Sequence, residues 1–145
     1  MTDAGFEKIG QTAKRLYGEQ KLLLCGFPPA AQPKFKSLIG MIGLDHLPLV
    51  WVGTDDAGET VGNLMQRSDG SGEGAASDVP RAIIVAGIEE AELHQLMSGC
   101  RQAGMKQALW ATLTPTSEGW PLNKLLEELS AERRAMAAQS SRPTK

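Results

Sequence analysis

The strongest constraint on the fold is an internal repeat. The run Lys-Leu-Leu-Leu-Cys-Gly-Phe at residues 21–27 is echoed by Ala-Ile-Ile-Val-Ala-Gly-Ile at residues 82–88, so that Gly87 follows Gly26 by 61 residues. Gly104 follows Gly43 by the same 61 residues. Each copy has the pattern of a strand, a helix, a second strand and a short helix. A repeat of this length predicts an architecture of two matched halves.

The halves span residues 21–67 and 81–136 and predict an α/β fold. The first strand of each half is a continuous apolar run, which is typical of a strand buried on both faces. Within a half, the helical crossover is long enough to make the two strands parallel. We therefore expect a four-stranded, mostly parallel sheet with flanking helices. If the halves meet as symmetric mates, the strand order is 2-1-3-4. The alternative is a ferredoxin-like α+β fold, in which the linker returns the chain antiparallel.

Three further segments lie outside the halves. Residues 1–20 are expected to hold an N-terminal helix, because apolar side chains recur at helical spacing from Phe6 to Tyr17. Residues 68–80 are rich in Gly, Ser and Asp, lack periodicity and predict a flexible linker. The polar residues 137–145 predict a disordered tail.

Composition narrows the class of protein. The net charge is −2, and the chain shows none of the basic excess that a nucleic-acid-binding protein normally carries. No apolar run approaches the roughly 20 residues that span a bilayer, and the first residues do not read as a signal peptide. Cys25 and Cys100 both lie in apolar patterns. We expect buried, reduced thiols and a cytoplasmic location, with no membrane contact.

One cluster in the second half resembles a known family. Residues 111–120 read Ala-Thr-Leu-Thr-Pro-Thr-Ser-Glu-Gly-Trp, and a leucine-rich acidic segment follows at 122–129. Over residues 82–134 this pattern resembles a bacterial family of domains of unknown function, number 3783. Residues 21–67 match only as a degenerate copy, and Pro121 stands where a capping Thr or Ser is expected. The resemblance implies a fold and a shared loop, but no reaction.

The candidate binding residues lie at predicted strand ends. In parallel α/β sheets, ligands bind outside the carboxyl ends of the strands, at a switch in strand order. This edge would bring together Gly26, Phe27 and Gly87 with the hydroxyl-bearing turn that follows the fourth strand. The full set of candidates is Gly26, Phe27, Gly87, Thr114, Pro115, Thr116 and Trp120. The competing interpretation is architectural: the hydroxyls bond local backbone, and Trp120 packs on the core.

The sequence contains no motif that names a reaction. No catalytic residues, metal ligands or cofactors are predicted, because the strand-end glycines do not extend into a nucleotide-binding motif and neither histidine has a partner at ligand spacing. The favoured hypothesis is a binding or regulatory module whose partner is another protein or a second copy of the chain. The first alternative is a small-molecule sensor at the carboxyl edge of the sheet. The least favoured is a thiol enzyme that uses Cys25.

Overall fold

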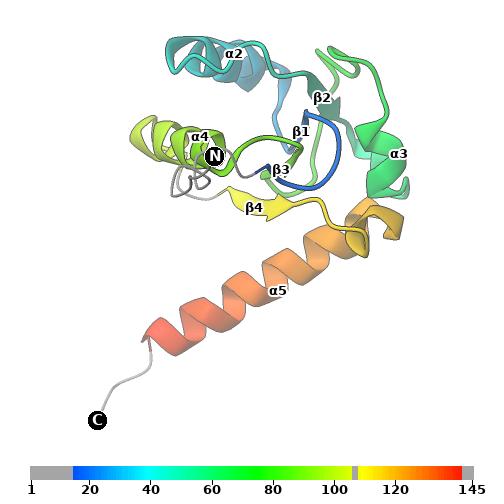
Figure 1. The fold of residues 1–145 in the computed structure, drawn as a ribbon. Coiled ribbons are helices and arrows are strands. Elements are labelled where there is room, and N and C mark those ends of the chain that lie inside the picture. Colours follow the sequence, from blue (N-terminus) through cyan, green and yellow to red (C-terminus); the bar gives the residue numbers. More distant parts are fainter. Residues whose placement is uncertain (1–14, 106–107, 142–145) are drawn as a thin grey trace, which may run out of the picture.

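The computed structural model describes residues 15–105 and 108–141, which form a four-stranded sheet between two layers of helices (Figure 1). The strands are β1 (Lys21–Cys25), β2 (Leu49–Val52), β3 (Ala82–Ala86) and β4 (Leu109–Thr112). Their order in the sheet is β2-β1-β3-β4, as the symmetric arrangement of halves predicts. The two apolar runs of the repeat are therefore the central strands, and both are buried on both faces.

The strand directions differ between the edges and the centre of the sheet. β2 runs parallel to β1, and β4 runs parallel to β3, so that the prediction of a mostly parallel sheet is confirmed. The central pair of β1 and β3 is antiparallel, with Leu23 opposite Ile84. These two residues are 61 positions apart, as are Thr60 and Pro121, which form an isolated antiparallel bridge. Equivalent positions of the two halves thus meet at two points.

Helices cover both faces of the sheet. The helices α2 (Gln32–Met41) and α4 (Glu90–Gln102) pack on one face, and α3 (Val61–Met65) and α5 (Leu122–Ser141) pack on the other. Each crossover places one helix of a half on each face. The single-turn 3-10 helices are η2 (Pro29–Ala31), η3 (Thr54–Asp56) and η4 (Ser117–Gly119).

The segment between the halves lies along the outer edge of β2. The amide of Leu49 donates to Asp69 Oδ1 at 2.8 Å, and the amide of Trp51 donates to the carbonyl of Ser71 at 2.8 Å. A side chain at Gly72 would place its Cβ 2.0 Å from the carbonyl oxygen of Trp51. Composition had predicted a flexible linker here. The structure instead shows that the glycines permit a close backbone approach that satisfies the peptide groups of an edge strand.

Both ends of the described chain differ from the sequence prediction. Arg15 forms an antiparallel bridge with Glu89, and the amide of Leu16 donates to Ile88, so residues 15–17 do not end a helix. The rest of the predicted N-terminal helix lies outside the described residues. At the other end, α5 continues to Ser141, into the segment predicted to be a disordered tail. Alanine has the highest helix propensity, and four alanines between positions 131 and 138 explain the extension.

Candidate functional site: α5 and its two grooves

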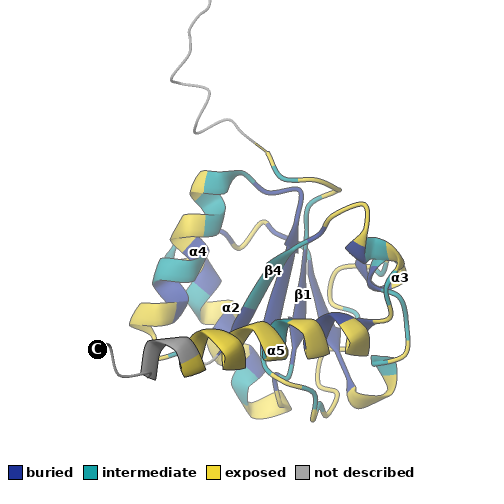
Figure 2. Cartoon of the chain, turned by 90° about the horizontal axis from the view of Figure 1, so that it is seen from below, coloured by how far each residue is buried: buried dark blue, intermediate teal, exposed yellow. Residues whose placement is uncertain are grey.

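The helix α5 changes environment along its length. Leu122, Leu125 and Leu126 in its first turns are buried against the sheet. From Ala131 to Ala138 every residue is exposed. The helix runs across the sheet and projects past β4, and its outward side faces solvent (Figures 1 and 2). The guanidinium of Arg133 donates from Nη2 to the carbonyl of Ala108 at 2.8 Å and ties the projecting half to the start of β4.

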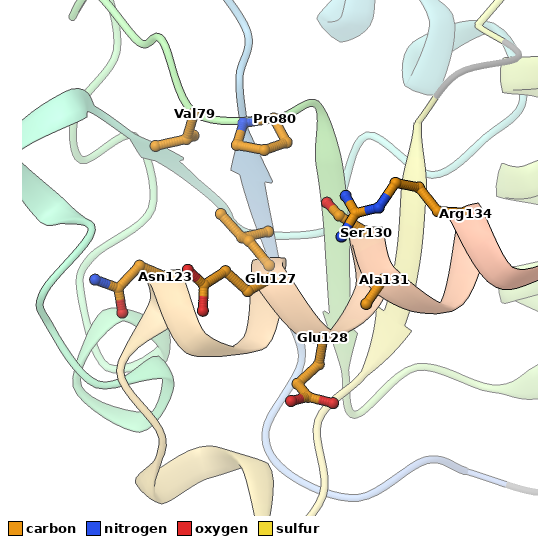
Figure 3. Close-up of a pocket in the computed structure, with 9 residues that line it drawn as sticks. Val79, Pro80, Asn123, Glu127, Glu128, Ser130, Ala131 and Arg134 are labelled. Atoms are coloured by element: carbon orange, nitrogen blue, oxygen red, sulfur yellow. The ribbon is translucent and has the colours of Figure 1, made fainter.

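One side of α5 borders a groove of about 550 Å³, here called the Pro80 groove. Val79 and Pro80 form one wall, and α5 forms the other (Figure 3). Most of the lining is apolar, while the carboxylate of Glu127 and the guanidinium of Arg134 supply opposite charges on the helix side. The lining residues are Val79, Pro80, Asn123, Leu126, Glu127, Glu128, Ser130, Ala131 and Arg134.

The other side of α5 borders a groove of about 390 Å³, here called the β4 groove. It lies between the start of β4 and the projecting half of the helix. Met136, whose side chain is 66% exposed, contributes the largest exposed apolar surface on α5. The lining residues are Ala108, Leu109, Trp110, Leu129, Glu132, Arg133, Met136 and Ala137.

The edge of the sheet beside this groove is open. The amides of Leu109 and Leu113 donate inward, to carbonyls of Arg81 and Val85. Because alternate peptide groups of a strand point to opposite sides, those of Trp110 and Thr112 point outward. Within residues 15–105 and 108–141, no backbone hydrogen bond from outside the sheet reaches these two residues. On β2, by contrast, the equivalent edge is covered by the segment that follows α3.

The structure separates the residues predicted to form one site. Cys25 at the end of β1 lies opposite Ala82 at the start of β3. Gly26 and Gly87 therefore lie at opposite ends of the sheet, because their strands run in opposite directions. The prediction that they share an edge is wrong. It assumed parallel central strands, and the shared switch point exists only in that arrangement.

Neither glycine borders an open crevice. A Cβ at Gly26 would lie 2.6 Å from the carbonyl oxygen of Val79, and a Cβ at Gly87 would lie 2.4 Å from the amide nitrogen of Gln20. Phe27 is 2% exposed and packs edge-to-face against the rings of Phe35 and Trp51. Backbone segments and a core aromatic side chain thus fill these two strand ends.

The Thr-Pro-Thr turn satisfies most of its own polar groups. The hydroxyl of Thr114 accepts the amide of Ser117 at 3.0 Å, and the hydroxyl of Ser117 accepts the amide of Thr114 at 3.1 Å. Pro115 and Thr116 are exposed, and Thr116 makes no side-chain cap. Nearby, the Tyr17 hydroxyl donates to Glu118, and this hydrogen bond raises the pKa of Tyr17. This turn lies beyond β4, at the Gly87 end of the sheet.

Trp120 is half-buried and packs against the core under α3 and α5. Its carbonyl accepts the amide of Val61 at 2.9 Å, and Lys124 Nζ lies 4.5 Å from the centre of its ring. This is the architectural arrangement: the indole covers the core, and a lysine covers the indole.

The two cysteines are buried in the core. Burial raises the pKa of the Cys25 thiol to about 12 and that of Cys100 to about 11. Cys25 faces α3 and α5, whereas Cys100 faces the opposite layer. At neutral pH both thiols are protonated, which is the unreactive form.

Sequence analysis did not identify the α5 surface. A signal was present: the apolar stripe Leu122, Leu125, Leu126 and Leu129 continues at helical spacing to Met136. The polar composition after residue 136 drew attention away from it. The exposure of this stripe depends on where the sheet ends, which the stripe itself does not record.

Comparisons with known proteins cover only the second half. No group of three or more His, Cys, Asp or Glu residues within the described chain is placed to hold a metal ion. None of the helices in those same residues combines the length and hydropathy needed to cross a bilayer. No curated protein and no solved structure matches the chain. Residues 81–136, from the start of β3 to Met136, match the model of the family described as Domain of unknown function (DUF3783), which confirms the resemblance of this half.

Proposed function

We propose that the protein is a protein-binding module of the cytoplasm, and that it binds through the α5 surface. We define this surface as the projecting half of α5, residues 129–138, together with the outer edge of β4. The observation that carries the proposal is the projecting half itself, on which Met136 is exposed beside the β4 groove. Apolar side chains gathered on an exposed groove are typical of interaction sites.

The open edge of β4 supports the same proposal independently. An edge strand with unpaired peptide groups accepts a further strand from a partner, and proteins usually cover such edges. This chain covers the edge of β2 with residues 69–72. The segment that occupies the equivalent position in the second half is α5, which leaves β4 uncovered.

The second candidate function is small-molecule sensing in the Pro80 groove. Its volume of about 550 Å³ lies within the range of ligand pockets, and Glu127 and Arg134 supply charged groups beside apolar walls. The site differs from the one that the sequence predicted, because Gly26 and Gly87 are covered by backbone.

A thiol enzyme is the least supported reading. A nucleophilic cysteine needs an accessible thiolate, and the Cys25 thiol is fully buried with a pKa raised to about 12. The Thr114–Ser117 pair likewise holds its hydroxyls in local hydrogen bonds.

Site-specific photo-cross-linking in living cells tests the proposal. A photoreactive side chain replaces Met136 in one variant and Met41 in a matched control, since Met41 is also an exposed methionine, 82% exposed, but lies on α2. We expect protein adducts at position 136 and none at position 41. Adducts at position 41 alone would contradict the α5 surface. Small-molecule sensing predicts protein adducts at neither position.

A further inference from the structure

We propose that the partner of the α5 surface is a second copy of this chain, whose α5 packs antiparallel against the first across a two-fold axis. This inference rests on the proposed function and names its partner. The argument begins with the side of α5 that faces the β4 groove. Leu129, Glu132, Arg133 and Met136 follow one another there at intervals of three, one and three residues, which places them on one face of the helix.

This stripe complements itself when it is reversed. An antiparallel copy presents the same four residues in the opposite order. Leu129 then meets Met136 of the second copy, and Glu132 meets Arg133 of the second copy. Apolar groups face apolar groups, and each acid faces a base. In a parallel pair, Glu132 would face Glu132 and Arg133 would face Arg133. Charge therefore selects the antiparallel arrangement, which is the self-complementary contact of a two-fold dimer.

The position of the stripe gives a second helix access to it. All four residues lie where α5 leaves the sheet, and Glu132, Arg133 and Met136 are exposed. The hydrogen bond from Arg133 to Ala108 positions the guanidinium at the start of β4, beside Glu132. Glu132 itself has no ion-pair partner in the described part of the chain. Two helices that project beyond their own sheets can approach to the 8–10 Å of ordinary helix packing.

The closing experiment uses complementary charge variants of the full chain. Glu132→Arg places Arg against Arg in a homodimer, and Arg133→Glu places Glu against Glu. Each variant alone should weaken self-association by about tenfold or more at low salt, because two attractive contacts become repulsive. An equimolar mixture of the two should associate again, since Arg at position 132 then meets Glu at 133, and Arg133 meets Glu132. Sedimentation velocity over a range of concentrations measures this.

Two controls accompany the pair. Glu127→Arg reverses a charge on the opposite side of α5, in the Pro80 groove, and should leave self-association unchanged. Circular dichroism melts of every variant show that it folds. Wild type should approach twice the chain mass of 15.5 kDa as concentration rises.

The outcomes separate this inference from the proposed function. A wild type that stays monomeric at all concentrations, or a dimer that ignores both charge variants, overturns the antiparallel α5 dimer. Adducts at position 136 that contain a different protein likewise overturn the inference, while they support the proposed function. Absence of any protein adduct at position 136 defeats the proposed function. Recovery of the dimer on mixing supports both.

Discussion

At the residue scale, the environment of each polar or reactive side chain separates architecture from function. Cys25 lies at a strand end, which is the position a nucleophile would take in the sequence, yet its side chain is enclosed by the core under α3 and α5. Thr114 and Ser117 bond to each other, whereas Thr116 two residues later makes no cap. Residue type alone does not distinguish these roles, because burial and partners decide them.

Alkylation tests the state of the two thiols. We expect iodoacetamide at neutral pH to leave Cys25 and Cys100 of the native protein unmodified, because burial shields them and raises their pKa values to about 12 and 11. Unfolding in urea should expose both to rapid reaction, as measured by mass spectrometry. The thiols also link stability to pH: their contribution is complete below the unfolded pKa of 9.0 and is lost as pH rises toward 11 and 12. Fast labelling of native Cys25 would revive the thiol-enzyme hypothesis.

The Thr-Pro-Thr turn offers a matched pair of substitutions. Thr114→Ala removes the hydroxyl that accepts the Ser117 amide and should cost about 0.5–2 kcal/mol of unfolding free energy. Thr116→Ala removes an exposed hydroxyl without a cap and should leave that free energy nearly unchanged. Urea denaturation measures both. If Thr116→Ala is stable but loses the adducts at position 136, the turn takes part in binding and the α5 surface is incomplete as defined.

At the element scale, the segments that follow the two short crossovers explain the asymmetry of the sheet. After α3, the chain turns back and covers β2 with residues 69–72. After Pro121, α5 continues for 20 residues and projects past β4. The same position in the repeat thus closes one edge of the sheet and leaves the other open for a partner.

Glycine substitutions test the covering of β2. Gly72→Ala would bring a Cβ within 2.0 Å of the Trp51 carbonyl oxygen, at a φ of +79°. We expect it to lower the unfolding free energy by about 1–3 kcal/mol or more, as strain and displacement of the segment combine. Gly70→Ala is the control, since it has φ of +90° but no atom within 4 Å. Equal losses in the two variants would show that φ alone matters and that the close approach to β2 does not.

At the scale of the whole molecule, the two halves meet around contacts between equivalent residues. Leu23 pairs with Ile84 in the sheet, and Thr60 pairs with Pro121 on the face that carries α3 and α5. The amide of Val61 donates to the carbonyl of Trp120, and the amide of Leu122 donates to that of Glu59, so that the bridge is reciprocal. The halves therefore form one body with a shared core, and the open edge of β4 and the projecting end of α5 lie on the same side of it (Figure 1).

The sequence by itself determined the strands, their order and the helices between them. Continuous apolar runs, helical stripes and punctuating glycines are local signals, and a constant offset of 61 residues carries the arrangement of one half to the other. Only the tertiary structure decided the direction of the central pair. The offset is the same for parallel and antiparallel mates, and the segment that sets the direction, residues 68–80, has no periodicity. That direction separated Gly26 from Gly87, and the limits of the sheet left the end of α5 exposed, because both depend on packing between segments far apart in the chain.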